Sequence, residues 1–264
     1  MKCAAWILGA VLIFVPACKG KKAPQFEFET IVFEKSYRDC KPESKDCTRL
    51  KLIYPKVVMG GNDGLRRKFN EVIMKWVETP FFEKESLGPE ALAQKMFSKY
   101  AGFQKEFPTN PIPWELQRTV SAEQVSPGIL NLDSTQYSFM GGAHPNTFRI
   151  LQSFNATTAE AYSLADLFKP GYEADLTKIG EKIFRKQMNV PPGENLGEAG
   201  FFFEKDVFKL NENFQMAPGG LKFFYNPYEV APYVVGPIEL IIPWAELKGL
   251  LKEYSPAAYF LNEK

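Results

Sequence analysis

Two hydrophobic periods follow each other along residues 25–107 and restrict the fold to a mixture of strands and helices. Apolar and polar side chains alternate over 25–33 and again over 49–58, which predicts two half-buried strands. Apolar side chains then recur at helical spacing over 65–77 and 89–107, which predicts two amphipathic helices. This part of the chain is therefore neither all-helical nor all-strand.

Shorter elements and turn residues follow through the rest of the chain. The expected elements are, in order, two strands within 114–139 that meet at the turn 126–128, a strand over 148–155, a helix over 172–188, a hairpin over 213–225, a strand over 238–242 and a closing helix from Pro243 that includes Leu247, Leu250 and Leu251. Because strands and helices are interspersed and several connections are hairpin turns, we predict an α+β fold. Its expected architecture is an antiparallel β-sheet flanked by amphipathic helices, in two subdomains of similar size.

The N-terminus has the features of an export signal. Lys2 supplies a positive charge, and residues 3–15 contain no charged side chain. This run is shorter than the ~20 apolar residues of a membrane-spanning helix and has the length of a signal peptide. It ends in Ala17-Cys18, which resembles a bacterial lipobox. We expect lipidation of Cys18 and anchoring to a bacterial membrane, on the periplasmic side or at the cell surface; an ordinary cleaved secretion signal is the alternative.

Two cysteines remain once Cys3 leaves with the signal and Cys18 takes lipid. Cys40 and Cys47 flank a short polar loop between the first two predicted strands. In an exported protein such a pair is expected to close a disulfide, with two free thiols as the alternative. A metal site would need two further ligands nearby, and the sequence offers none there.

The charged residues nearly balance, which limits the class of partner. Lys and Arg number 32 against 31 Asp and Glu, and the formal net charge is +1. Nucleic-acid binding requires a strong positive field, so we exclude nucleic acid as the main partner. The glycine-rich turn at 60–64 matches no phosphate-binding fingerprint, and we expect no cofactor.

Residues 141–146, Gly-Gly-Ala-His-Pro-Asn, form the most unusual local sequence and hold the single histidine, His144. A catalytic role for His144 as a general base would require an acid or nucleophile beside it. The other interpretation is a tight loop at a sheet edge, in which His144 and Asn146 bond to the main chain. Both residues are candidates for a binding role.

A second candidate segment is 226–233, Asn-Pro-Tyr-Glu-Val-Ala-Pro-Tyr. Pro227 and Pro232 could hold Tyr228 and Tyr233 outward as a contact surface of low conformational entropy for a protein partner. Alternatively the prolines brace a crossover whose tyrosines pack down onto the sheet. The sequence does not decide between the two.

Two segments, in their order along the chain, resemble the DUF3298 (RsiV-like) domain, which a DUF4163 segment often precedes. They are residues 141–146 and the run from Gly220 to Tyr233, which is followed by Gly236 and by 241–247. The resemblance covers about residues 115–253. It implies an extracytoplasmic α+β domain. The outer domain of the anti-sigma factor RsiV binds lysozyme, and another relative carries the domain beside a peptidoglycan deacetylase. This sequence shows no sigma-binding segment and no deacetylase domain, so the carried-over expectation is recognition of a lysozyme-like protein or a wall glycan.

The expected organisation is a lipoprotein signal peptide at 1–17, a flexible spacer at 18–25, an N-terminal α+β (DUF4163-like) region at 26–140, a C-terminal DUF3298 (RsiV-like) region at 141–256 and a tail at 257–264. We expect a lipid-anchored, non-catalytic binding protein of the cell envelope that recognises lysozyme or peptidoglycan. Two alternatives stay open: an envelope hydrolase that uses His144, and a structural or assembly lipoprotein with an unrelated partner.

Overall fold

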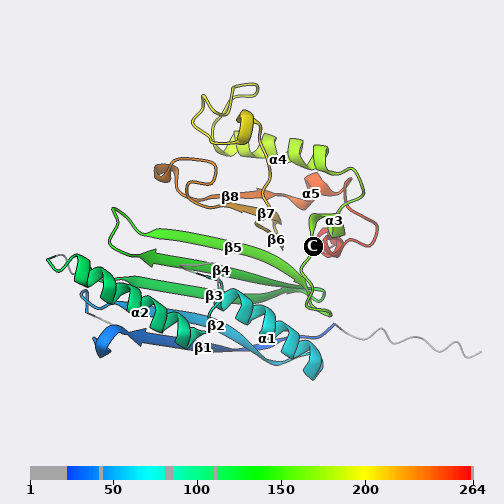
Figure 1. Ribbon diagram of the computed structural model, residues 1–264. Coiled ribbons are helices and arrows are strands. Elements are labelled where there is room, and N and C mark those ends of the chain that lie inside the picture. Colours follow the sequence, from blue (N-terminus) through cyan, green and yellow to red (C-terminus); the bar gives the residue numbers. More distant parts are fainter. Residues whose placement is uncertain (1–22, 42–43, 81–85, 110–111, 263–264) are drawn as a thin grey trace, which may run out of the picture.

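The computed structural model describes residues 23–41, 44–80, 86–109 and 112–262. The signal peptide expected at 1–17 and the lipidation expected at Cys18 fall outside this part of the chain. Two β-sheets, one mixed and one antiparallel, each accompanied by helices, make up the described structure (Figure 1). This arrangement confirms the predicted α+β fold.

The first sheet has five strands in the order β1-β2-β3-β4-β5. The strands are β1 (Glu27–Ser36), β2 (Arg49–Met59), β3 (Glu115–Ser126), β4 (Ile129–Phe139) and β5 (Asn146–Asn155). Neighbouring strands are antiparallel except β2 and β3, which are parallel. The chain reaches β3 through two helices, α1 (Asp63–Val77) and α2 (Pro89–Glu106), and a parallel pair requires a long crossover of this kind.

Helices α1 and α2 cover one face of this sheet (Figure 1). Phe69 and Ile73 of α1 and Met96 of α2 are almost completely buried, together with Leu50 and Leu52 of β2. The alternation of apolar residues in β2 and their helical spacing in α1 and α2 therefore meet in one hydrophobic core. Burial of these side chains is the main stabilising contribution in this half of the protein.

A disulfide joins Cys40 and Cys47 in the connection between β1 and β2, as the sequence predicted. The two strands it connects are antiparallel, with Ser36 opposite Arg49 at the end nearest the disulfide. The covalent bond therefore closes the hairpin at its loop.

A buried arginine connects the first sheet to the end of α1. Arg118 of β3 is 2% exposed, and its guanidinium donates to the main-chain oxygens of Val77 at 2.6 Å and Thr79 at 2.7 Å. It also donates to the side-chain oxygen of Gln136. The last carbonyls of a helix have no partner within the helix, and a cation favours the negative end of the helix dipole. Burial lowers the pKa of Arg118 to about 10, so the group stays charged at neutral pH.

The second sheet has three antiparallel strands in the order β6-β7-β8. Its strands are β6 (Phe214–Ala217), β7 (Gly220–Tyr225) and β8 (Ile238–Ile242), and the helices of this half are α3 (Leu164–Leu167), α4 (Glu173–Gln187), α5 (Trp244–Leu247) and α6 (Tyr259–Asn262). Short 3-10 turns occur at Tyr37–Asp39, Glu204–Asp206, Tyr233–Val235 and Pro256–Ala258. Helix α4 packs on this sheet and buries Phe184 among other aromatic rings.

Two sequence-based expectations differ from the structure. The closing helix expected from Pro243 through Leu251 ends at Leu247, and Leu251 instead forms an isolated β-bridge with Phe168. Apolar spacing predicted a longer helix, but the segment after Leu247 turns to pair with the chain before α4. The first sheet also continues to Asn155, beyond the division expected between residues 140 and 141.

The second sheet lies beside the outer edge of β5 (Figure 1). Side chains that bond to the main chain of β5 take the place of a neighbouring strand there. Asn213 and Asn226 bond to the main chain of Arg149 and Leu151, at distances between 2.6 and 3.0 Å. Further along, the hydroxyl oxygen of Ser153 accepts a hydrogen bond from the main-chain N–H of Met216 at 2.8 Å. We call this set of contacts the amide seam. The seam provides partners for main-chain N–H and C=O groups at the edge of β5, which would otherwise be free to pair with another chain.

Candidate functional site

Three exposed aromatic rings from the two sequence motifs come together beside the amide seam. The ring of His144 stacks on Tyr233, with centroids 4.0 Å apart and planes 15° from parallel. The Nε2 atom of His144 lies 3.3 Å from the hydroxyl of Tyr228, which is 84 residues away along the chain. The hydroxyl of Tyr233 donates to the main-chain oxygen of Pro145 at 3.3 Å. We call His144, Tyr228 and Tyr233 the aromatic cluster.

The aromatic cluster faces solvent. Tyr228 is 55% exposed and Tyr233 is 36% exposed, and Val234 beside them is 90% exposed. Of the two interpretations of residues 226–233, the structure therefore agrees with outward-facing tyrosines. Exposed aromatic side chains whose rings already stack on one another lose little conformational freedom on binding.

The loop that carries the tyrosines is held by its polar residues. Asn226 is bonded to β5 in the amide seam, and Glu229 accepts hydrogen bonds from the main-chain N–H of Asn226 at 2.8 Å and from the side chain of Asn211 at 2.7 Å. Tyr228 between them has a φ of 67°, a left-handed conformation that is unusual for a tyrosine. The local hydrogen bonds hold this conformation, which turns the ring of Tyr228 towards His144.

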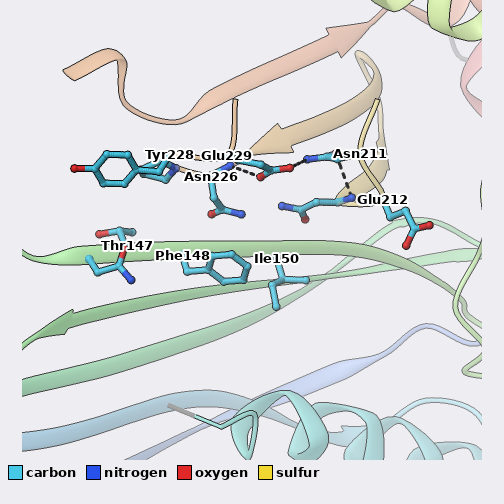
Figure 2. A pocket seen from close by; sticks show the side chains of 11 residues that line it. Thr147, Phe148, Ile150, Asn211, Glu212, Asn226, Tyr228 and Glu229 are labelled. Carbon is cyan, nitrogen blue, oxygen red and sulfur yellow. Dashed lines mark hydrogen bonds between the residues drawn. The ribbon is translucent and has the colours of Figure 1, made fainter. Parts of the chain in front are cut away.

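A cavity of about 700 Å³ opens between β5 and this loop. Figure 2 shows Thr147, Phe148 and Ile150 on β5, facing Tyr228 and Glu229 across the cavity. Phe148 is 45% exposed and supplies, with Ile150, an apolar floor. The remaining lining side chains are Asn146, Asn211, Glu212, Asn213, Asn226 and Pro227.

A second cavity of about 360 Å³ lies on the other side of the loop, beside Tyr233. Thr135, Thr147 and Arg149 contribute to its lining from the first sheet. Arg149 donates two hydrogen bonds from Nε and one from Nη2 to Asp133 and lies 3.5 Å from Glu239. Hydrogen bonding to Asp133 raises the pKa of Arg149 above its ordinary value. The charge of Arg149 is therefore compensated by carboxylates within the protein.

The structure brings several of the predicted site residues to one place. Pro227, Tyr228 and Asn146 line the larger cavity, and Tyr233 lines the smaller one. The second hydrogen bond of His144 joins its Nδ1 atom to the main-chain oxygen of its neighbour at 3.1 Å. Within the described part of the chain no carboxylate bonds to the imidazole, whose two partners are the hydroxyl of Tyr228 and a main-chain oxygen.

Sequence reasoning did not find the residues that position this surface. Asn213 and Arg149 bond to each other across 64 residues of sequence and lie outside the two motifs. Glu229 lies inside residues 226–233, but no sequence pattern marked its role. The run Asn211-Glu212-Asn213 before β6 was a usable signal, because asparagine side chains often bond to nearby main chain where a strand begins.

Two further features concern only the residues that the structure describes. No helix among them is both long enough and apolar enough to cross a membrane. They also contain no group of three or more His, Cys, Asp or Glu side chains placed to hold a metal ion.

The fold and this surface define an α+β protein with two joined sheets and an exposed aromatic cluster at their junction. Residues 165–245 match the family model described as a protein of unknown function, DUF3298. Residues 42–147 match a second family model, described as Deacetylase PdaC. None of the proteins with curated descriptions matches this sequence.

Two solved structures described as DUF3298 family members share the fold of this chain. A member of the DUF3298 family from Bacteroides fragilis has a TM-score of 0.72 and 19% identity, with 92% of this chain and 100% of that chain covered. A DUF3298 family protein from Pseudomonas aeruginosa has a TM-score of 0.63 and 18% identity, with 87% and 95% covered. The similarity extends over both sheets and is not confined to residues 165–245.

Proposed function

We propose that this protein is a non-catalytic binding protein of the bacterial cell envelope, and that it recognises a lysozyme-like protein through the aromatic cluster. The observation that carries the proposal is that His144 stacks on Tyr233 and contacts Tyr228 in one exposed aromatic surface, although His144 lies 84 residues before Tyr228 in the sequence. Tyrosine is enriched among the residues that dominate protein–protein binding energies. The resemblance to RsiV supports lysozyme as the first partner to test.

A pull-down with immobilised c-type lysozyme tests this proposal. The wild-type protein should be retained, and Tyr228→Ala or Tyr233→Ala should each weaken binding by about 2 kcal/mol, or about thirtyfold. Tyr254→Ala is the matched control, because Tyr254 is 89% exposed and lies outside the aromatic cluster. Failure of the wild-type protein to bind lysozyme would remove lysozyme as the partner. Equal loss in all three variants would argue against the aromatic cluster.

Peptidoglycan is the second candidate ligand, and the smaller cavity is the observation that favours it. Tyr233 lines this cavity together with Thr135, Thr147 and the charge-compensated Arg149. Apolar faces combined with a few polar groups suit an uncharged, hydroxyl-rich ligand. Co-sedimentation with insoluble peptidoglycan, compared between the wild type and Tyr233→Ala, would distinguish this ligand from a protein partner.

The envelope location is proposed from the sequence of the N-terminus. Cleavage before Cys18 and its acylation would anchor the protein, since each buried CH₂ of an acyl chain contributes about 0.8 kcal/mol. Mass spectrometry of the mature protein should find a lipid-modified Cys18, and Cys18→Ala should abolish membrane association. Recovery of the unprocessed chain from the cytosol would contradict this part of the proposal. Crosslinking in intact envelopes would also report an unrelated partner if the protein serves in assembly.

A further inference from the structure

The larger cavity carries an uncompensated negative charge. Its eleven lining residues include two carboxylates, Glu212 and Glu229, and no lysine or arginine. Neither carboxylate has an ion-pair partner among the residues that the structure describes. The smaller cavity differs in this respect, because Asp133 and Glu239 balance its Arg149.

The two carboxylates differ in the hydrogen bonds that they already form. Glu229 accepts hydrogen bonds from Asn211 and from the main chain of Asn226, so it is committed to holding the loop. Glu212 is exposed and no interaction occupies its side chain within the described residues. Figure 2 shows Glu212 at the opposite end of the cavity from Tyr228. Glu212 is therefore the group available to a ligand.

The floor between these two ends is apolar. Phe148 and Ile150 of β5 lie along it, and both belong to the lining of the cavity (Figure 2). A ligand that matches both features needs an apolar stem to lie on the floor and a positive head to reach Glu212. Lysine and arginine side chains have this construction, since their aliphatic stems cover apolar surface while the charged head stays at a polar edge.

We propose that the larger cavity receives a lysine or arginine side chain of the protein partner, with its stem on Phe148 and Ile150 and its head at Glu212. This inference deepens the proposed function, because it states the chemistry of the partner: a basic surface that presents one long cationic side chain. Charge complementarity selects this occupant. An acidic segment would be repelled by Glu212 and Glu229, and a neutral apolar one would leave Glu212 without a counter-charge.

Two small probes test the inference without depending on the partner. N-acetyl-lysine methylamide and N-acetyl-norleucine methylamide differ at the end of the side chain, where only the first carries a charge. In NMR titrations of the isotope-labelled full chain, the lysine probe should shift the amides of Phe148 and Glu212 and bind at least about tenfold more tightly. Glu212→Gln should remove this preference, while Glu253→Gln, at an exposed site elsewhere, should keep it.

The outcomes separate this inference from the proposed function. Equal binding of both probes, or an unchanged preference in Glu212→Gln, would overturn the assignment of the cavity, whatever lysozyme does. Binding of the lysine probe at Glu212 without retention of lysozyme would support the cavity and reject lysozyme as the partner. If lysozyme is retained, its affinity should fall with added salt more steeply for the wild type than for Glu212→Gln.

Discussion

The side chain of Asn226 pairs with both main-chain groups of Arg149: its Oδ1 accepts from the N–H at 2.6 Å, and its Nδ2 donates to the carbonyl oxygen at 3.0 Å. One amide thus takes the place of a paired strand at the edge of β5. The next residues of the same loop carry Tyr228 and Tyr233. The position of the aromatic cluster therefore depends on the same bonds that join the two sheets.

Asn226→Ala should destabilise the protein and displace the aromatic cluster together. Asn226 is 6% exposed, so its removal leaves the N–H of Arg149 buried without this partner, and we expect a loss of about 2 kcal/mol in the free energy of unfolding. Urea denaturation measures the loss. Asn146→Ala is the control, because the Asn146 side chain is exposed and forms no bond in the seam; it should change stability by less than about 0.5 kcal/mol. Equal effects of the two substitutions would contradict the role given to the seam.

Arg118→Ala should be among the more damaging single substitutions in the first sheet. It removes the donor to the carbonyls at the end of α1 and leaves them buried, which should lower the free energy of unfolding by about 3 kcal/mol. Arg118→Lys keeps the charge but lacks the forked donor geometry, so its loss should be smaller but clear. Thermal and urea unfolding of the two variants test the order. A loss of less than about 1 kcal/mol in Arg118→Ala would show that the contacts contribute little.

The stability of the protein should fall at alkaline pH because of Tyr225. Burial, with a smaller effect from Glu229, raises the pKa of Tyr225 well above its ordinary value of 10.0. The folded protein therefore keeps this proton at a pH where the unfolded chain releases it, so the contribution is complete below pH 10 and is lost as the pH rises further. Tyr225→Phe should flatten the dependence of unfolding free energy on pH above 10. An unchanged slope in that variant would assign the dependence to other groups.

Removing the disulfide should lower the free energy of unfolding, because the unfolded chain gains conformational freedom. Cys40 and Cys47 are 7 residues apart, and closing a loop of this size corresponds to about 2.5 kcal/mol in the chain-entropy description. The double variant Cys40→Ser, Cys47→Ser should lose about this amount in urea denaturation. A reductant should lower the stability of the wild type towards that of the variant and leave the variant unchanged.

Local patterns predicted most of the secondary structure. Alternation in β1 and β2 and helical spacing in α1 and α2 identified these elements within a few residues, because each buries one face against a common core. The prediction of a hairpin closed by Cys40 and Cys47 was also confirmed. The parallel pairing of β2 with β3 was not predictable in this way, since it depends on how two intervening helices pack.

The geometry of the candidate site was beyond sequence reasoning for a related reason. The sequence singled out His144, Tyr228 and Tyr233, but their stacking results from the docking of two sheets, which no local period encodes. Arg118 is a comparable case, because the carbonyl it reaches on Val77 lies 41 residues earlier in the chain. Side chains that bond to distant main chain leave no periodic pattern, so their roles become visible only in the folded molecule.

Side-chain amides and a hydroxyl, none of which ionises, make the hydrogen bonds of the amide seam, while Arg149 and Glu239 add one ion pair between the sheets at 3.5 Å. Asn131 completes the set by donating to the main-chain oxygen of Met216 at 2.7 Å. Neutral hydrogen bonds do not respond to dissolved ions as exposed charge pairs do. The amide seam should therefore keep the two sheets together in concentrated salt, where binding that depends on Glu212 weakens, so the protein would release a partner without losing its shape.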